Sequence, residues 1–475
     1  MESTYDLIVV GTGFASSFFL KRYLELSKQN IRVLVLERGE FHPHKHRLAA
    51  KKGETEIPIT KAGKTYTTQS DKIWVFDPNF GGSSNCWTGC TPRFMPNDFK
   101  MKSEYGIGTD WPISYSDVDD YYHQAEEIMG IGGPQVTPFP KSRPYPLPPQ
   151  QLSRVDRLMQ KKYKELYISQ PTARATKSFN GRNACCTSAV CDVCPVNAKM
   201  TIENTFEEIY NDNRVTIKYN AQVVGLNTTQ SKADSLVYYD GTQTRTVKGD
   251  SIALGANGIF NAHILLNSGD TNPLTGTGIT EQVGLFARLY YKDLANVGGS
   301  SIITANGYMM YDGKHREEQA GCLIESFNTP FIRNERGKWR NLSIFKFVYE
   351  DLPQESNKVT LSDNERIPSI VYKGHSAYTQ KAIDTLPENL EKYFSFLPIE
   401  KMEVDNYRQK TEFHICSSTR MGGTVENSVV DKNMVHHTWR NVVVLGSSVY
   451  PTTTPANPTL TLSALSLRAA DQYFG

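Results

Sequence analysis

The 475-residue sequence has almost no net charge, no long apolar run and no internal repeat. Its 52 lysines and arginines nearly balance 50 aspartates and glutamates, which leaves a formal net charge of +2. Attraction to nucleic acid comes mainly from neutralised phosphates, so a chain without a basic excess is not expected to bind it. No segment approaches the roughly 20 consecutive apolar residues of a membrane-spanning helix, so we expect no direct membrane span.

The N-terminus also lacks the features of an export signal. Residues 1–10 contain neither a basic start nor a long apolar stretch, so no signal peptide is expected. The chain is therefore expected to be cytoplasmic, or to be exported or held at a membrane through a partner subunit. Its 39% hydrophobic and 21% charged residues are typical of a folded globular protein, and its length predicts two domains.

Residues 5–37 have the pattern of a strand, a glycine-rich turn, a helix and a second strand. The apolar strand at 6–10 leads directly into the turn, and the second strand, at 33–36, ends at an acidic residue. Glycines let the backbone approach a pyrophosphate at the helix N-terminus, and the acid accepts hydrogen bonds from ribose hydroxyls. The candidate residues are Gly11, Gly13, Ser16 and Glu37. The pattern predicts a dinucleotide site without distinguishing NAD from FAD.

Further motifs follow along the rest of the chain. They are Gly-Gly-Ser-Ser-Asn-Cys-Trp at 81–87, Asp-Trp-Pro-Ile-Ser-Tyr at 110–115, Ala-Leu-Gly-Ala-Asn-Gly at 253–258, Gly-Ser-Ser at 446–448 and Ala-Asn-Pro at 456–458. Together and in this order they resemble the glucose–methanol–choline (GMC) oxidoreductases, FAD enzymes that oxidise alcohols. The resemblance implies an α/β fold, with a Rossmann-like FAD-binding domain and a second α+β substrate domain built on a mostly antiparallel sheet.

The resemblance also divides the chain into segments. The FAD-binding domain would comprise residues 1–98, 180–275 (with the cysteine cluster) and 414–475, while 99–179 would supply lid segments and 276–413 the substrate domain. Partial alternation of apolar residues within the last segment favours strands, and a longer amphipathic run favours a helix. The expected strands are 286–291, 300–304, 342–349 and 358–362, and the expected helix is 382–394.

Positions in the motifs imply ligands of FAD. Gly11, Gly13, Ser16 and Glu37 would bind its ADP half, Gly82, Ser83 and Asn85 would lie along the flavin, and Ser448 and Pro458 would approach the ring. Residues 81–90 contain no histidine, so a histidyl–flavin bond is not expected and FAD would be held non-covalently. Gly446 departs from the family pattern, since many relatives have an acid at this position before the Ser-Ser pair.

Alcohol oxidation by a flavin needs a base for the hydroxyl proton while the carbinol hydride goes to flavin N5. By resemblance His414 is this base, and Asn457 is the second member of the family's His/Asn or His/His pair, which would orient the alcohol oxygen. Imidazole suits the first role because its usual pKa of about 6.5 leaves neutral base near neutrality. Local sequence alone favours a structural histidine and a turn asparagine. The pair His436–His437 is interpreted as part of a solvated loop.

Four of the eight cysteines, Cys185, Cys186, Cys191 and Cys194, fall within ten residues. The residues themselves leave structural zinc, a redox dithiol, disulfides and an iron–sulfur cluster open. The spacing also resembles a GMC branch of bacterial sugar dehydrogenase catalytic subunits. That resemblance implies a 3Fe–4S cluster on Cys185, Cys186 and Cys191, with Cys194 spare or secondary.

These inferences together predict FAD-dependent oxidation of a sugar, glycoside or polyol hydroxyl to a carbonyl. Electrons would leave through the iron–sulfur cluster to an external acceptor, a cytochrome or a quinone-linked subunit, and a small accessory subunit is a further expected partner. No Cys-x-x-Cys-His motif occurs in the chain, so any haem would belong to another subunit. Two alternatives stay open, a standalone FAD oxidase that uses oxygen and a non-catalytic flavin electron-transfer protein.

Overall fold

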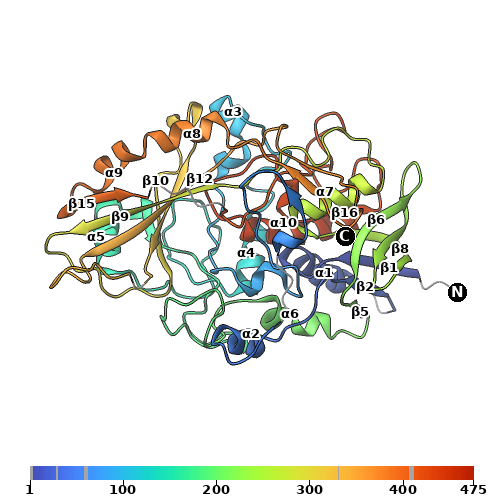
Figure 1. The fold of residues 1–475 in the computed structure, drawn as a ribbon, viewed down its shortest axis with the longest axis horizontal. Helices are drawn as coiled ribbons and strands as arrows, with labels where there is room; N and C mark the ends of the chain where they lie inside the picture. Colours follow the sequence, from blue (N-terminus) through green and yellow to red (C-terminus); the bar gives the residue numbers. More distant parts are fainter. Residues whose placement is uncertain (1–3, 28–29, 58–61, 330, 406–410) are drawn as a thin grey trace.

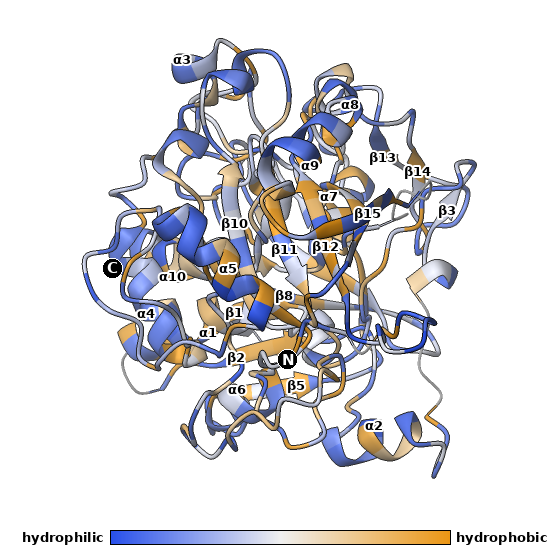
Figure 2. Ribbon diagram, turned by 90° about the vertical axis from the view of Figure 1, so that its left-hand side faces the viewer, coloured by the Kyte–Doolittle hydropathy of each residue, from blue (hydrophilic) through white to orange (hydrophobic). Residues whose placement is uncertain are grey.

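The computed structural model describes residues 4–27, 30–57, 62–329, 331–405 and 411–475. Figure 1 shows two sheets at opposite ends of the molecule, with β1, β2, β6 and β8 at the right and β9, β10, β12 and β15 at the left. Figure 2 shows hydrophobic residues concentrated on the strands of both sheets, while outer helices such as α3 and α9 are mostly hydrophilic. None of the described helices is long and apolar enough to cross a membrane.

The first sheet is built around a strand that is buried over its second half, β1 (Thr4–Val10). It pairs in parallel with β2 (Val33–Leu36) and β8 (Thr244–Leu254), β2 pairs in parallel with β5 (Val215–Lys218), and β16 (Val442–Val444) pairs in parallel with β8. Parallel strands are covered on both faces, which explains their continuous apolar runs. This is the Rossmann-like part of the fold.

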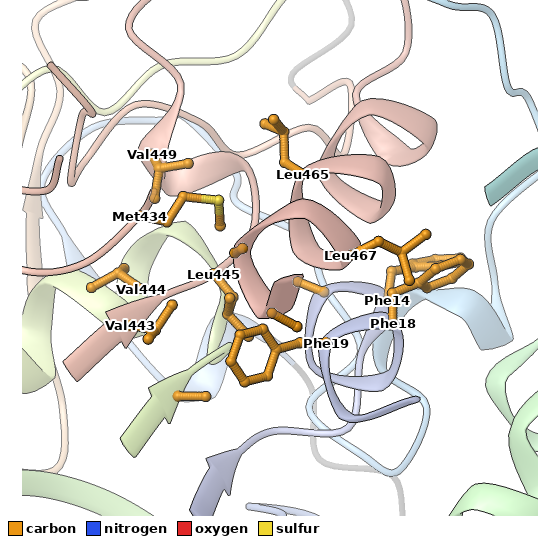
Figure 3. Close-up of a cluster of buried hydrophobic side chains, with 14 of the residues drawn as sticks. Phe14, Phe18, Phe19, Met434, Val443, Val444, Leu445, Val449, Leu465 and Leu467 are labelled. Carbon is orange, nitrogen blue, oxygen red and sulfur yellow. The ribbon is translucent and has the colours of Figure 1, made fainter. Parts of the chain in front are cut away.

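Two antiparallel strands, β7 (Ala233–Tyr239) and β6 (Gln222–Thr228), extend this sheet from the first half of β8. Helices α1 (Phe14–Leu26) and α10 (Thr459–Phe474) lie side by side against the sheet, one from each end of the chain. Figure 3 shows their apolar side chains meeting those of β16 and its neighbours in one buried cluster. The two ends of the chain therefore form a single core.

The second sheet has six strands, and each pair of neighbours is antiparallel. In sheet order they are β15 (Ile399–Val404), β9 (Val283–Tyr291), β12 (Leu342–Tyr349), β11 (Cys322–Phe327), β10 (Ile303–Met310) and β4 (Tyr167–Ser169). Helices α5 (Arg154–Tyr163), α8 (Ala377–Asp384) and α9 (Leu386–Phe394) bury their apolar residues on one face of it. The opposite face is turned toward the first sheet.

The remaining elements are short. A small sheet is formed by β13 (Lys358–Thr360), β14 (Ser369–Val371) and β3 (Thr67–Thr68). The other α-helices are α2 (His44–Lys51), α3 (Met101–Tyr105), α4 (Asp119–Met129), α6 (Ile202–Tyr210) and α7 (Asn257–Asn267). The 3-10 turns are η1 (Ala62–Lys64), η2 (Gly82–Asn85), η3 (Pro96–Phe99), η4 (Lys164–Leu166), η5 (Lys314–Glu317) and η6 (Ser447–Val449).

The predicted fold class is confirmed, with an α/β domain and a second domain on an antiparallel sheet. The predicted domain boundaries stay a prediction. The expected single helix at 382–394 is wrong in detail, because α8 and α9 are separate helices and Pro387 lies in the first turn of α9. Proline lacks an N–H and suits a helix start but not a helix interior.

The interpretation of His436 as part of a solvated loop is also wrong. The residue is 1% exposed, its ring is stacked on that of Trp439, and its Nε2 lies 3.2 Å from Oδ2 of buried Asp270. A histidine that pairs with a buried carboxylate in this way is part of the core.

Candidate active site

A cavity of about 670 Å³ lies between the two sheets. One wall comes from the carboxyl ends of β1, β2, β8 and β16, and the opposite wall from side chains of the antiparallel sheet. Ligands of parallel α/β sheets bind at this edge because the strands stop there and the following loops and helix N-termini face outward.

The glycine-rich turn after β1 lies at one end of this cavity. Gly11 has φ +83°, and a Cβ there would lie 2.7 Å from the carbonyl oxygen of Gly255. A Cβ on Gly13 would meet no protein atom within 4 Å, so the backbone of this residue is open toward the cavity. Gly13 is also the N-cap of α1. The turn can therefore accept an anionic group closely.

Glu37 lies in the same part of the cavity, at the end of β2. Its carboxylate accepts hydrogen bonds from the Thr12 N–H at 3.1 Å and the Gly39 N–H at 2.9 Å. Burial raises the pKa of Glu37 above its usual range, and these two donors oppose the shift. Backbone N–H groups therefore hold the Glu37 carboxylate beside the glycine-rich turn, where it is predicted to bind the ribose.

Six of the nine residues predicted to bind FAD line the cavity, namely Gly11, Gly13, Glu37, Gly82, Ser83 and Pro458. The other three lie behind its wall. Ser16 donates a hydrogen bond to the Val10 carbonyl at 3.0 Å, and its Oγ fills the space where a Cβ on residue 255 would lie. Asn85 donates to Asp77 at 3.0 Å, and Ser448 accepts from Asn261 at 3.0 Å. These three side chains hold the wall together.

His414 also lines the cavity. Its Nδ1 lies 2.6 Å from Oε1 of Gln282, and its backbone N–H donates to Oε2 of Glu281 at 3.3 Å. Burial lowers the pKa of His414 to about 3, and the ammonium of Lys346 adds to the shift. The imidazole is therefore neutral at ordinary pH and able to accept a proton.

Asn457 lines the same cavity, one residue before Pro458, which caps the N-terminus of α10. Its Nδ2 donates a hydrogen bond to Oε1 of Glu325 at 3.3 Å. Its Oδ1 is buried and has no hydrogen-bond partner among the described residues. The structure thus brings His414 and Asn457, predicted from separate motifs, into one cavity.

Sequence reasoning missed the charged residues on the antiparallel sheet. Glu325 on β11 and Lys346 on β12 are register partners, and both line the cavity beside Glu412. Lys346 pairs with Glu412, and its ammonium lies 5.5 Å from the ring centroid of Phe286. Burial raises the pKa values of both carboxyl groups, and Lys346 opposes both shifts. One charged residue inside an otherwise apolar strand was the available signal, because a side chain at such a position needs a partner or a cavity.

The four clustered cysteines do not gather into a metal site. Cys185 is half-buried, Cys186 is exposed, and Cys191 and Cys194 are buried. Within the described ranges no three His, Cys, Asp or Glu side chains are placed to hold a metal ion. The Cys191 Sγ lies 2.6 Å from Oγ of Ser301, and the Cys194 Sγ accepts from a backbone N–H. This arrangement of thiols does not fit the predicted three-ligand cluster.

Lys199 connects the cysteine-rich loop to the edge of the cavity. It is 1% exposed, and its ammonium donates to the carbonyl oxygens of Trp87 at 2.8 Å, Asp192 at 2.6 Å and Asn85 at 3.1 Å. Burial lowers the pKa of Lys199 to about 8. Trp87 and Asp192 both line the cavity, so the loop and the cavity wall are mechanically linked.

Residues 353–466 match the family model described as GMC oxidoreductase. Over 98% of the chain, the sequence is 25% identical to the fructose dehydrogenase large subunit of Gluconobacter japonicus, with 97% of that protein covered. It is also 25% identical to 2-methyl-1,2-propanediol dehydrogenase of Mycolicibacterium austroafricanum and 24% identical to paromamine 6'-oxidase of Streptomyces fradiae. These two matches cover 98% and 100% of the chain, and 94% and 92% of the relatives.

Solved structures share the fold. Pyridoxine 4-oxidase from Mesorbium loti superposes with a TM-score of 0.70 at 16% identity, over 99% of both chains. Formate oxidase of Aspergillus oryzae RIB40 superposes with a TM-score of 0.64 at 14% identity, over 99% of this chain and 98% of that one. The predicted resemblance is confirmed by these matches, and the named relatives are dehydrogenases and oxidases.

Proposed function

We propose that this GMC-type oxidoreductase binds FAD and oxidises a hydroxyl group of a sugar, glycoside or polyol to a carbonyl. The observation that carries the proposal is the shared cavity. His414 and Asn457 lie in the wall of the same cavity that begins at the dinucleotide-type turn of Gly11 and Gly13. A base and an amide beside a flavin site are the groups that alcohol oxidation requires.

The residues present fit FAD. The open backbone at Gly13, the N-terminus of α1 and the carboxylate of Glu37 suit a pyrophosphate and its ribose. Gly82 and Ser83 would lie along the flavin, and the N-terminus of α10 at Pro458 would face its ring. When bound, FAD supplies the hydride acceptor at its N5 atom.

His414 would take the proton of the substrate hydroxyl. Because its pKa is lowered to about 3, the imidazole enters the reaction neutral. Asn457 would orient the alcohol oxygen, since an amide keeps its hydrogen-bonding capacity at every pH. Its Oδ1 is buried without a hydrogen-bond partner among the described residues, which supports a role for this amide in holding a bound group.

The substrate class rests on the cavity wall and on the relatives. The wall combines aromatic rings, Phe286 and Phe327, with the charged side chains of Glu325, Lys346 and Glu412, which can bind hydroxyl groups. The relatives are named for fructose, 2-methyl-1,2-propanediol and paromamine, and each of these compounds carries hydroxyl groups. A polyhydroxylated substrate is consistent with both observations.

Anaerobic mixing with a panel of sugars, glycosides and polyols tests this function. At least one compound should bleach the oxidised-flavin absorbance, and His414→Ala should retain FAD but slow this reduction by about 100-fold or more, the usual contribution of a general base. His46→Ala, at an exposed position of α2, is the matched control. Normal single-turnover reduction in H414A would remove His414 from the mechanism. Failure of every compound would favour a flavin electron-transfer protein.

We further propose that electrons pass to an external acceptor, a cytochrome or a quinone-linked subunit, rather than to oxygen. The support is that one relative is named as the large subunit of a fructose dehydrogenase, and another as the gluconate 2-dehydrogenase flavoprotein of Pantoea cypripedii. Both names describe dehydrogenases, and the first implies a partner subunit. Fast reduction of an artificial dye with little oxygen consumption is the expected result. Stoichiometric hydrogen peroxide would identify an oxidase.

The 3Fe–4S cluster on Cys185, Cys186 and Cys191 stays a proposal that rests on the spacing of the cysteines. Because the thiols do not gather in this structure, no step of the reaction is assigned to it. The cluster is tested directly by measuring the iron and acid-labile sulfide content of the purified protein and its electron paramagnetic resonance spectrum. Cys186→Ser should remove the iron, whereas Cys322→Ser, in buried strand β11, should not. Wild-type protein without iron would reject the cluster.

A further inference from the structure

Gln282 lies behind His414, and two backbone carbonyls determine its orientation. The residue is 4% exposed and precedes β9. Its Nε2 donates to the carbonyl oxygens of Thr454 at 2.7 Å and Ala456 at 2.8 Å. An amide nitrogen has two donors, whereas an amide oxygen only accepts. The reversed amide would place its oxygen against two carbonyl oxygens, so only one orientation satisfies all of the groups.

This orientation determines which nitrogen of His414 carries the proton. The Oε1 of Gln282 lies 2.6 Å from Nδ1 of His414 and can only accept a hydrogen bond. Nδ1 must therefore be the N–H. A neutral imidazole has a single N–H, so Nε2 keeps its lone pair.

We propose that Gln282 is a positioning residue that holds His414 as the Nδ1–H tautomer, so that Nε2 is the atom that accepts the substrate proton. The proposal rests on the assignment of His414 as the base. It goes beyond that assignment because it names the reacting nitrogen and the side chain that selects it.

The same amide also holds the segment that carries Asn457. Ala456, whose carbonyl accepts from Gln282, directly precedes it in the chain. The neighbouring Glu281 accepts from the backbone N–H of His414. Glu281 therefore holds the backbone of His414, while Gln282 holds its ring and the turn before Asn457. Their partners are 132 to 174 residues away in sequence, so only the packed domains create this contact.

A neutral amide is the suitable group at this position. Oε1 can accept from Nδ1 both before and after His414 takes a proton, so the hydrogen bond persists through the reaction. A carboxylate would instead stabilise the imidazolium by its charge and raise the pKa of His414. It would also face the carbonyl oxygens of Thr454 and Ala456 without a donor.

Anaerobic stopped-flow reduction of FAD-loaded Gln282→Met is the first test. Methionine has similar length but no hydrogen-bonding amide, so the imidazole can adopt either tautomer. The limiting reduction rate should fall about 10- to 100-fold, the size of effect seen when the hydrogen-bond partner of a metal-bound histidine is lost. The apparent substrate affinity should change by no more than about threefold. The matched control is Gln354→Met, because the Nε2 of Gln354 donates only to a loop carbonyl, that of Gly374.

The double variant separates this proposal from the proposed function. In a His414→Ala background, Gln282→Met should cause a much smaller loss than in the wild type, because residues that act through one another are not additive. The loss that remains measures the effect of Gln282 on the turn before Asn457. Full additivity would overturn the proposal, as would an unchanged rate in Q282M when H414A is slow. A normal rate in H414A would instead reject His414 as the base, and with it the premise.

Gln282→Glu adds a second measurement, the pH dependence of the reduction rate. A purely structural role of Gln282 would not change this pH dependence. The acidic limb of the reduction rate should shift to higher pH in this variant, because the added carboxyl favours the imidazolium of His414. This variant decides the question if Q282M does not retain FAD. An unchanged pH profile in Q282E, with FAD bound, would contradict the proposal.

Discussion

Lys72 and Glu281 form a buried ion pair, with side chains that are 7% and 0% exposed. Oε2 of Glu281 also accepts the backbone N–H of His414 at 3.3 Å. Lys72 lies over the ring of Trp74 at 4.7 Å, and burial lowers its pKa to about 7. A buried pair of charges therefore supports the loop that carries the proposed base.

Removal of one partner of this pair should destabilise the protein. Lys72→Met leaves the Glu281 carboxylate buried without its cation, and we expect a loss of about 3 to 5 kcal/mol in the free energy of unfolding. Chemical denaturation of the apoprotein measures it. The double variant Lys72→Met/Glu281→Gln should recover most of the loss, since the amide can still accept from His414. No recovery would show that Lys72 acts through other contacts.

Over the ordinary pH range, protonation of His414 from solvent should not change the rate of flavin reduction. Because its pKa is lowered to about 3, the imidazole stays neutral as the pH falls, and the limiting rate should fall only near the acidic end of the range. Anaerobic stopped-flow measurements across pH test this. A limb near neutrality that persists in Lys72→Met/Glu281→Gln would contradict the expectation, because that variant lacks Lys72, the group supporting the His414 loop whose pKa lies at about 7.

His263 should make the protein sensitive to acid. It is 1% exposed, and burial, with a smaller effect of Arg38, lowers its pKa to about 4. The unfolded chain binds a proton at about pH 6.5, so stability from this group is present at neutral pH and is lost as the pH falls toward the folded value. The loss should reach about 3 kcal/mol near pH 4.

His263→Gln should remove this part of the pH dependence. The variant is expected to lose less stability than the wild type between neutral and acidic pH, whatever its stability at neutral pH. Denaturation at both pH values measures the difference. His46→Gln, at an exposed position of α2, should keep the wild-type slope. An unchanged slope in the His263 variant would assign the acid sensitivity to other groups.

Alanine substitutions at two glycines of the dinucleotide turn should distinguish a loss of stability from a loss of FAD affinity. Gly11→Ala places a Cβ 2.7 Å from a backbone oxygen at φ +83°, so it should reduce both stability and FAD content. Gly13→Ala meets no protein atom within 4 Å, so it should fold normally but bind FAD at least about tenfold more weakly, because its methyl group enters the space of the cofactor. Thermal unfolding of apoprotein and FAD titration measure the two effects.

Gly63→Ala is the control for both variants, since a Cβ at this position also meets no protein atom and the residue does not line the cavity. It should resemble the wild type in both measurements. Equal FAD affinity in G13A and G63A would contradict the placement of the pyrophosphate at this turn.

Local patterns were sufficient for most of the fold. The apolar run before Gly11 and the strand that ends at Glu37 follow from short-range rules, because a glycine turn and a buried strand need few distant contacts. The strand predicted at 300–304 was only partly correct, since β10 begins at Ile303. The break between α8 and α9 was visible as Pro387 but was not used.

The candidate site was predicted less completely. Ser16, Asn85 and Ser448 belong to motifs that the sequence shows clearly, yet their side chains support the wall and do not line the cavity. A motif identifies the segment that forms a wall, but which of its side chains face the cavity depends on the packing behind it. Gln282 has no motif around it, and only its distant partner reveals it. Glu325 was marked in the sequence only as a charge within a mostly apolar strand, and its contact with Asn457 appears only in the fold.

The sequence by itself determined the dinucleotide turn, the two kinds of sheet and the candidate pair His414 and Asn457, because these follow from local spacing and from a resemblance carried by short motifs. The tertiary structure alone decided what surrounds that pair. Gln282 meets His414 across 132 residues, and the charged pair Lys346–Glu412 faces the cavity, because two separate domains pack their walls together. Such contacts depend on the packing of whole sheets, for which no local pattern exists.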